Sequence, residues 1–393
     1  MQLSTTPAEY CCPGDGRPIS RAVHLGRLAR FYPACRRCEH RVDSGPISAR
    51  RLRRIREAER RGLPCSPFCG EAVSGVLWNE LTPDLARKAA AALGMWLREQ
   101  GTVGDAPATL VGSDGRALAT ELVAAVSDGL RWAGCHLIEI GPATAPATAA
   151  ALGRMDCDGG ILVGNPAGEK ATVGFRFWGQ GGRPLSSPGS LEEIRRILES
   201  GPSRPTRRYG AARRLPIDAV YLEPMGELYH ALRPLRLVLD CTSPAILSYV
   251  DTLMAATACE WSLCECRPGQ LGSKVVGERA HLGIRLEEDG ERCQVVDERG
   301  RDVSPERVAV LVARELGSTA ACMRLDTADR ENAYQLLRTC DAALAMDTAG
   351  RLWHRSGERL WAPDALMTLT LLLKQLSRSD AELSKRLDDG ALG

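Results

Sequence analysis

Two cysteines near the N-terminus stand at the spacing of a metal-binding knuckle. The segment Cys35-Arg-Arg-Cys38 places two residues between its thiols, and paired thiolates at this spacing can chelate one tetrahedral Zn²⁺. Disulfides are rare in the cytoplasm, where clustered thiols are more often metal ligands. The pattern therefore predicts a structural zinc site.

The other ligands of this zinc site are less sharply defined. Cys12 lies 23 residues before Cys35, a separation typical of a zinc ribbon, yet its surroundings read Cys11-Cys12-Pro-Gly-Asp15. The fourth ligand is left open between His40 and Cys11, and Cys65-Ser-Pro-Phe-Cys69 offers another pair. We take Cys12, Cys35 and Cys38 as the candidate zinc ligands. The alternative is a degenerate ribbon with buried or idle thiols.

The N-terminal segment is also basic. Fourteen arginines lie between residues 17 and 61, whereas the whole chain carries a net charge of +2. Such a segment fits a phosphate-rich partner, either nucleic acid or an anionic surface. Phe31 and Tyr32 are the aromatic residues among these arginines, so base stacking has little support. We favour a solvated basic face over nucleic-acid binding.

Composition points to an ordinary globular protein. The 393 residues are 44% hydrophobic and 25% charged, which is typical of a soluble chain long enough for about two to four domains. No apolar run reaches the roughly 18 residues of a membrane span. The first residues lack the apolar core of a signal peptide. We expect a cytoplasmic protein with no membrane partner.

From about residue 71, apolar strands alternate with helices. Thr82 as N-cap and Pro83 at the first helical position predict a helix that runs to Trp96. Alternation of this length implies parallel crossover units. The pattern further predicts strands at 108–112, 135–140 and 160–163 and helices at 119–133 and 145–152.

The same α/β unit recurs further along the chain. The basic, Pro- and Gly-containing segment Arg204–Arg214 is interpreted as a linker, after which strands are expected at 235–240 and 258–263. A third unit begins near Pro305 and ends in a helix over 364–377. The expected organisation is a Cys/Arg-rich module at 1–70, containing a helix over 49–61, then units at 71–203, 215–304 and 305–390.

The segment Gly159–Gly179 carries a family resemblance. It resembles the nucleophile loop of the phosphoglucomutase/phosphomannomutase (alpha-D-phosphohexomutase) family, written G-I-M-I-T-A-S-H-N-P-x-x-Y-N-G-I-K, and aligns with it without gaps. The family's phosphorylated serine falls on Pro166, and the next histidine falls on Ala167. A pyrrolidine ring has no hydroxyl group to carry a phosphoryl group. The resemblance implies a mutase scaffold without its nucleophile.

Further motifs follow in the family's order. Val111-Gly-Ser-Asp-Gly-Arg116 is similar to V-G-R-D-T-R, and Gly141-Pro-Ala-Thr-Ala-Pro146 is similar to G-x-x-x-T-P. The resemblance implies an α/β fold of three successive phosphohexomutase-type domains, here preceded by a zinc-ribbon-like module. The family's fourth domain, which clamps the substrate phosphate, is expected to be absent because the sequence stops at Gly393.

The resemblance also assigns a metal loop. Leu282-Gly-Ile-Arg-Leu-Glu-Glu-Asp-Gly-Glu-Arg292 resembles L-G-I-A-F-D-G-D-A-D-R, so the three metal aspartates fall on Glu287, Asp289 and Glu291. All three offer oxygen ligands, but two are longer by a methylene, and magnesium tolerates little deviation from an octahedron. The alternatives are a residual magnesium site and a solvated acidic turn, of which we favour the second.

The sugar-reading loop of the family, G-E-x-S-G-H, aligns with Met346-Asp-Thr-Ala-Gly-Arg351. Asp347 and Gly350 remain, and with Arg292 they are the candidate substrate contacts that the resemblance implies. The serine and histidine are replaced, so hydrogen bonds to sugar hydroxyls would be mostly lost. The loop therefore predicts weakened recognition of a hexose phosphate.

Four parts of the family's machinery are thus altered together. Phosphoryl transfer depends on several parts acting at once, so we predict a catalytically impaired or inactive relative that serves as a scaffold or regulator, through a protein partner or homo-oligomer. One alternative is an active mutase, for which Thr172 is the nearby hydroxyl in the loop. Another is an adaptor that binds a partner or nucleic acid through residues 1–70.

Overall fold

The computed structural model describes a main body and several stretches before it. The earlier stretches include α1 (Arg21–Ala29) and the 3₁₀ helix η2 (Glu39–Val42). The helix expected over 49–61 lies outside the described residues except at 49, 50 and 53. The described residues are 10–11, 18–29, 32, 35, 38–43, 45, 48–50, 53 and 67–388, the last without 78–79, 102–105, 167, 169–171, 265–268, 318–321 and 357–359.

The first sheet is mixed, and its described strands have the order β1-β2-β6-β5-β3-β4-β7. The central strands β3, β4 and β5 are parallel, whereas β6 runs antiparallel to both β5 and β2. Every residue of β5 and β6 is buried, as expected of strands covered on both faces. The strand bounds are β1 Phe68–Cys69, β2 Ala72–Val76, β3 Ala108–Ser113, β4 His136–Pro142, β5 Gly159–Gly164, β6 Thr172–Gly179 and β7 Ala212–Arg214.

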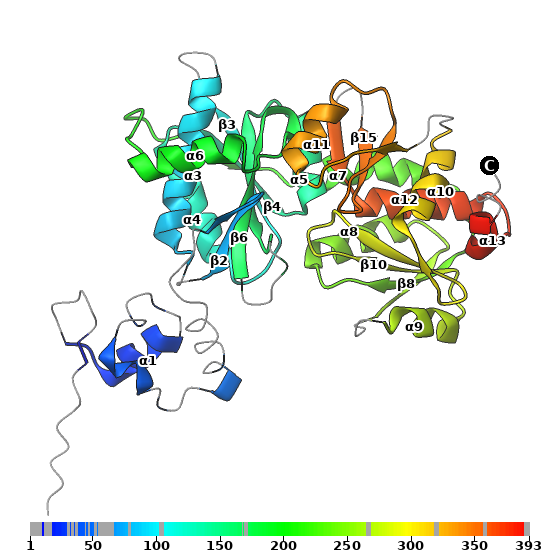
Figure 1. The fold of residues 1–393 in the computed structure, drawn as a ribbon, viewed down its shortest axis with the longest axis horizontal. Coiled ribbons are helices and arrows are strands. Elements are labelled where there is room, and N and C mark those ends of the chain that lie inside the picture. The colour runs from blue at the N-terminus through cyan, green and yellow to red at the C-terminus, as the bar shows by residue number, and fades with distance from the viewer. Residues whose placement is uncertain are drawn as a thin grey trace, which may run out of the picture.

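Helices cover both faces of this sheet. One face packs through Val111 and Phe175 against α3, α4 and α6 (Figure 1). The other face packs through Leu110 and Ile138 against α5 and joins the core of the rest of the molecule. The helix bounds are α3 Pro83–Gln100, α4 Ala119–Trp132, α5 Ala145–Arg154 and α6 Ser190–Ser200, and η3 spans Gln180–Gly182.

A second sheet follows, with the strand order β12-β11-β10-β8-β9. The pairs β8–β9 and β8–β10 are parallel, while β10 and β11 form an antiparallel hairpin whose connection is the acidic loop 287–292. The bounds are α7 Asp218–Gly226, η4 Glu227–Tyr229, β8 Arg236–Asp240, α8 Pro244–Met254, β9 Glu260–Leu263, α9 Leu271–Glu278, β10 Leu282–Leu286, β11 Cys293–Asp297 and β12 Asp302–Val303.

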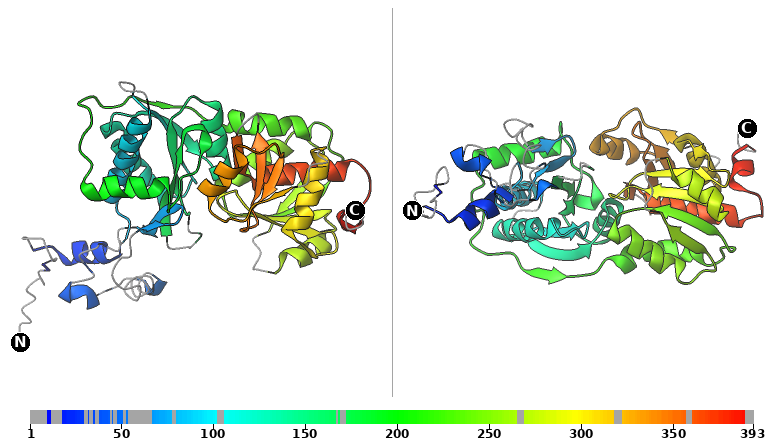
Figure 2. Two further views of the ribbon diagram at one scale, coloured as in Figure 1. Left: turned by 45° about the horizontal axis from the view of Figure 1, so that its top comes forward. Right: turned by 90° about the horizontal axis from the view of Figure 1, so that it is seen from below.

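A third, smaller sheet has the order β13-β14-β15-β16. Leu366, Leu369 and Leu373 of α12 belong to the same core as Ile284 of the second sheet. Figures 1 and 2 show the first sheet at one end of the main body and the other two at the opposite end, with α12 between them. The bounds are α10 Pro305–Glu315, β13 Met323–Arg324, α11 Arg330–Leu337, β14 Leu344–Met346, β15 Leu352–Ser356, β16 Leu360–Pro363, α12 Ala365–Ser377 and α13 Leu383–Asp388.

Most of the expected elements of the main body are present. The helix at Pro83 begins as predicted, with the Thr82 hydroxyl accepting from the Leu85 amide at 3.2 Å, but it continues to Gln100 because Leu97 also faces the core. The interpretation of Arg204–Arg214 as a linker is wrong at its end. Ala212–Arg214 forms β7, an edge strand that pairs in parallel with β4 although its side chains are exposed.

A carboxylate on α11 connects the third sheet to the first. Glu331 accepts hydrogen bonds from the amides of Ser186 and Ser190, at 2.8 and 3.2 Å, and from the Ser190 hydroxyl at 2.6 Å. Ser190 is the first residue of α6, where backbone N–H groups have no partner within the helix. Gly189, with φ of 154°, leaves room for this contact, because a Cβ there would lie 2.8 Å from Glu331 Oε2.

The buried N-cap of α12 generates a pH-dependent prediction. Asp364 accepts from the Met367 amide at 2.9 Å and from the Tyr221 hydroxyl at 3.0 Å, and burial raises the pKa of Asp364 to about 6. The folded state therefore holds this proton more tightly than the unfolded chain. Its contribution to the free energy of unfolding is present at low pH and is lost as pH rises to about 6.

The variant Asp364→Asn keeps a good N-cap but cannot ionise. We expect its free energy of unfolding to fall less than that of the parent protein between pH 4.5 and 7, with a difference of about 2 kcal/mol. Urea denaturation at a series of pH values measures this. The half-buried N-cap variant Asp329→Asn is the control, and identical pH slopes for all three proteins would contradict the assignment.

Candidate functional site

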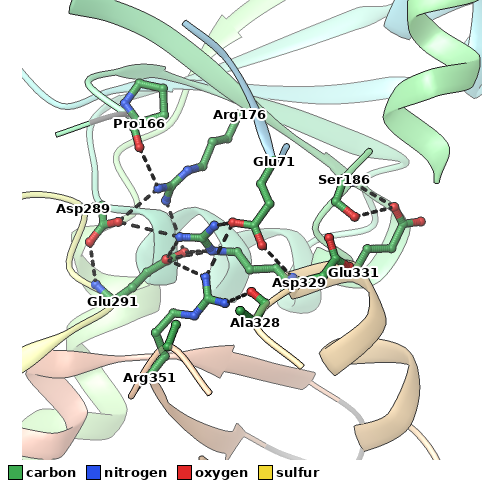
Figure 3. A network of polar contacts seen from close by, with 12 residues as sticks. Glu71, Pro166, Arg176, Ser186, Asp289, Glu291, Ala328, Asp329, Glu331 and Arg351 are labelled. Atoms are coloured by element: carbon green, nitrogen blue, oxygen red, sulfur yellow. Dashed lines mark hydrogen bonds and ion pairs between the residues drawn. The ribbon is translucent and has the colours of Figure 1, made fainter. Parts of the chain in front are cut away.

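Loops from all three sheets meet in one cleft with a volume of about 830 Å³. The first sheet contributes the loop after β5, with Asn165 and Pro166, and the second contributes the acidic loop after β10. The third contributes Arg330 and Arg351. The sequence-predicted nucleophile, metal and sugar-reading loops are therefore brought together, and Figure 3 shows the polar network at their centre.

The acidic loop is wedged between two helix N-termini. The Ala145 amide at the start of α5 donates to the Asp289 carbonyl at 3.1 Å, and the Ala365 amide at the start of α12 donates to the Gly290 carbonyl at 2.9 Å. Gly290 has φ of 80°, and a Cβ there would lie 3.1 Å from Thr144. Only glycine adopts this conformation readily, so the loop is fixed in place by its backbone.

Glu291 is buried and paired with arginines. Its side chain is 3% exposed. Arg330 Nε lies 3.0 and 2.8 Å from its two carboxylate oxygens, and Arg176 Nη1 lies 3.3 Å from Oε1. Burial raises the pKa of Glu291, and the Arg176 guanidinium opposes this rise. The carboxylate points into the protein, toward guanidinium groups (Figure 3).

Arg176 links the acidic loop to the loop of Pro166. Its Nη2 lies 3.1 Å from Asp289 Oδ2 and donates to the Pro166 carbonyl at 3.3 Å. The second oxygen of Asp289 accepts from the Glu291 amide at 3.1 Å. At the position of the family's phosphoserine, the group that faces the acidic loop is thus a backbone carbonyl held by a guanidinium.

Glu287 pairs with an arginine of its own loop. Its Oε2 pairs with Arg292, at 2.8 Å from Nε and 2.6 Å from Nη2, on a partly exposed surface. Each of the three candidate metal ligands therefore faces a guanidinium. Among the described residues, no three carboxylate, histidine or cysteine side chains gather in a way that could hold a metal ion. This donor set does not fit an octahedral magnesium ion.

Arg330 also reaches the first sheet. Its guanidinium forms an ion pair with Glu71, and its backbone amide donates to Glu71 Oε1 at 2.7 Å. Arg351 Nη1 lies 3.5 Å from the same carboxylate. One buried guanidinium from the third sheet therefore joins a carboxylate of the first unit to a carboxylate of the second.

In the loop aligned with the family's sugar-reading motif, the carboxylate of Asp347 accepts its hydrogen bonds from nearby residues of the same segment. The Asp347 carboxylate accepts from the amides of Ala349 and Arg351, both at 3.0 Å, from Arg351 Nε at 2.6 Å and from the Trp353 indole at 2.9 Å. Gly350 has the positive φ, 75°, that this tight turn needs. Asp347 and Gly350 shape the loop, while Ala349 and Arg351 face the cleft.

The motif Val111–Arg116 contacts the acidic loop from the first sheet. Arg116 pairs with Asp114 at 3.0 Å and with Glu288, which also accepts from the Thr242 hydroxyl at 2.7 Å. Gly164 is required here, because a Cβ at this position would lie 2.6 Å from Asp114 Oδ2. Every acidic residue of the loop is therefore bound by an arginine.

Sequence reasoning missed three members of the site: Glu71, Arg176 and Arg330. For Arg176 a signal existed, since it is the charged residue of a strand whose eight positions are all buried. Such a residue must have a partner of opposite charge. For Arg330 the signal is weaker, an arginine directly after the N-cap Asp329 of a helix. Nothing local distinguishes Glu71.

The predicted zinc module is only partly described. Cys35 and Cys38 are both buried, and the Cys38 amide donates to the Cys35 carbonyl at 3.3 Å. Cys12, the third candidate ligand, lies outside the described residues.

No helix in the described part of the chain is long and apolar enough to cross a membrane.

Comparison with known proteins agrees with this geometry. Residues 69–204 match the family model "Phosphoglucomutase/phosphomannomutase, alpha/beta/alpha domain I". A phosphoglucosamine mutase of Arthrobacter sp. (strain FB24) is 29% identical over 268 residues, or 62% of this chain and 57% of the relative. One from Natranaerobius thermophilus is 29% identical over 270 residues, or 64% and 60%. The chain spans less than two thirds of the length of these relatives.

Solved structures share the fold. A phosphoglucomutase/phosphomannomutase family protein from Burkholderia thailandensis superimposes with a TM-score of 0.71 at 23% identity, covering 82% of this chain and 79% of the other. Parafusin, a phosphoglucomutase from Paramecium, gives 0.63 at 13% identity, covering 84% and 73%. These matches show that the chain shares the fold of these proteins. These comparisons support membership of the alpha-D-phosphohexomutase family, and residues 69–204 match the model of its domain I.

The buried guanidinium generates a stability prediction. Arg330→Met leaves Glu291 without its closest partner, and breaking a buried ion pair in this way destabilises a protein by about 3–5 kcal/mol. Adding Glu291→Gln removes the unpaired charge and should recover part of this loss. Urea denaturation of both variants tests the expectation. Arg314→Met, at an exposed position in the last turn of α10, is the control, and an equal effect there would contradict it.

Proposed function

We propose that this protein is a phosphohexomutase relative that binds a hexose phosphate in its cleft without transferring the phosphoryl group, and that acts as a regulator or scaffold. The observation that carries the proposal is the pairing of Arg176 and Arg330 with Asp289 and Glu291. These guanidinium groups take up the lone pairs that a metal ion would need. On this proposal, the acidic loop has no free carboxylate oxygens with which to bind the metal ion that assists phosphoryl transfer.

The nucleophile position supports the same conclusion. Pro166 offers a carbonyl and no hydroxyl, and that carbonyl accepts from Arg176. The nearby Thr172 hydroxyl is buried and donates to Asn165 Oδ1 at 3.0 Å. A phosphoryl acceptor must be accessible and activated by a base, and this hydroxyl is engaged within its own loop.

Binding without turnover is compatible with the cleft that remains. Its volume of about 830 Å³ lies within the range of small-molecule sites. Its walls come from all three sheets, so an occupant contacts three units at once. Such a ligand would stabilise one arrangement of the units, which is how occupancy of the cleft could be communicated to a partner.

The test is a mutase assay on the full chain. With 1-phosphates of glucose, mannose and glucosamine, Mg²⁺ and a hexose bisphosphate, we expect no 6-phosphate above a preparation of the vector control. We also expect Pro166→Ser to remain inactive, because the arginines still hold the acidic loop. Turnover by the parent protein that disappears in Asp289→Asn would establish an active enzyme and overturn the proposal.

Ligand binding is measured separately by isothermal titration calorimetry with glucose 6-phosphate and glucosamine 6-phosphate. We expect binding that is unchanged when Mg²⁺ is replaced by EDTA, because no metal ion contributes to the site. Binding that requires Mg²⁺ would contradict the proposal that arginines occupy the carboxylates of the acidic loop in place of a metal ion. Absence of binding to either compound would leave an inactive scaffold and remove the ligand from the proposal.

We also propose structural zinc in the N-terminal module, supported by the buried pair Cys35 and Cys38. Metal analysis of the purified protein should give about one zinc per chain. Cys38→Ser should lower this content, whereas Cys322→Ser in the third unit should not. Zinc that is absent from the parent protein, or equally present in both variants, would contradict the site.

A further inference from the structure

The basic segment 204–214, which leads from the first unit to the second, is packed against the end of the first sheet. A Cβ on Gly210 would lie 1.6 Å from the Cys135 carbonyl oxygen, and glycine is the residue that permits such a close approach of two backbones. The Gly210 amide donates to the Arg131 carbonyl at 3.0 Å, and Arg131 Nε donates to the Gly210 carbonyl at 2.9 Å. The segment is therefore held in place before β7 begins.

The strand β7 leaves one of its edges open. It is the last strand in the order of the first sheet and pairs with β4 on one side. The Ala211 carbonyl and the Leu215 amide both bond to β4, at 2.8 and 3.0 Å. Successive residues of a strand direct their backbone groups to opposite edges, so Ala212 and Arg214 present N–H and C=O groups on the other side. No described group pairs with them. An unpaired edge of this kind can accept a further extended chain.

The open edge is bordered by exposed positive charge. No acidic residue occurs between Glu199 and Asp218. Arg214 pairs with Glu139 at 2.9 Å, yet its side chain remains 87% exposed. The other exposed arginines of the segment form no ion pair with a described carboxylate; they are Arg204, Arg207, Arg208 and Arg213. An extended chain that pairs with this edge would therefore meet guanidinium groups along its length.

We propose that the open edge of β7 binds an acidic, extended segment of a partner protein as an additional strand. The backbone groups of Ala212 and Arg214 would supply hydrogen bonds to its main chain, as in other cases of strand addition. Glutamate or aspartate side chains of the partner would face Arg213 and Arg214, because opposite charges on neighbouring strands stabilise the pairing. The inference rests on the scaffold role proposed above and names the surface and the chemistry of the partner.

Two other occupants match this edge less closely. A second copy of the chain would place its own Arg213 and Arg214 opposite the same residues, and like charges on neighbouring strands are destabilising. A nucleic acid would meet the positive charge but has no peptide backbone to pair with the edge. The Tyr209 ring is already contacted by the guanidinium groups of Arg131 and Arg204, 5.8 and 5.0 Å from its centroid, which leaves it poorly placed to stack on a base.

The test is fluorescence anisotropy of the full chain with a labelled peptide of alternating glutamate and valine. We expect a Kd of about 100 μM or tighter. Arg213→Glu should weaken binding by about tenfold or more, because it replaces attraction with repulsion. Ala212→Pro should weaken it by about fivefold, because proline removes one outward N–H without changing the charge. Proline is tolerated on an edge strand where the N–H faces solvent.

Two controls accompany these variants. Arg314→Glu reverses an exposed charge in the last turn of α10 and should leave the affinity unchanged. A peptide of alternating lysine and valine should not bind. Melting temperatures identify the variants that are folded, and Arg213→Glu alone decides the outcome if Ala212→Pro does not fold.

Three outcomes would overturn the proposal. The first is absence of binding to the acidic peptide at millimolar concentration. The second is binding that is unchanged in Arg213→Glu, which would place the peptide elsewhere. The third is tighter binding of a labelled oligothymidylate that is weakened by Arg213→Glu and unaffected by Ala212→Pro, which would assign the edge to nucleic acid through charge alone. No residue of β7 lines the cleft, so the mutase and ligand-binding assays decide the proposed function separately.

Discussion

The arrangement of the three units depends on one buried guanidinium, that of Arg330. It belongs to the third unit, it pairs with Glu291 of the second, and it pairs with Glu71 of the first. A buried charge is tolerated only when it is paired and hydrogen-bonded. The three units therefore satisfy one another's charges at the point where their loops meet. The shape of the cleft follows, because Arg176 and Arg351 are packed around the same carboxylates.

The same constraint explains why the altered parts of the machinery belong together. Without a cation, the carboxylates of the acidic loop would repel one another in a low dielectric. Arg116, Arg176, Arg292 and Arg330 neutralise them from four different segments. Restoring the serine alone would leave these arginines in place. The proline at position 166 and the arginines paired with the acidic loop are thus joined in one set of contacts through Arg176.

Local sequence predicted the elements of the main body well, because apolar runs and caps such as Thr82 and Pro83 act over a few residues. It failed at β7, whose exposed basic residues carry no strand pattern and which is defined only by its backbone pairing with β4. The loops of the site were located through the family resemblance. Their arginine partners were not, because Glu71 and Arg330 are 259 residues apart and meet only in the folded chain. Asp347 shows a further limit: its residue type suggests a ligand contact, but its oxygens are used within its own turn.

The contact between Glu331 and the start of α6 makes the first unit sensitive to the orientation of the third. A hinge motion that separated the units would leave the Ser186 and Ser190 amides without their acceptor and would strand a carboxylate that is 7% exposed. Small displacements would already break these short hydrogen bonds, since they weaken steeply with distance and angle. We therefore expect the first and third units to adopt two distinct relative orientations, one with this contact formed and one with it broken, and no continuous range between them.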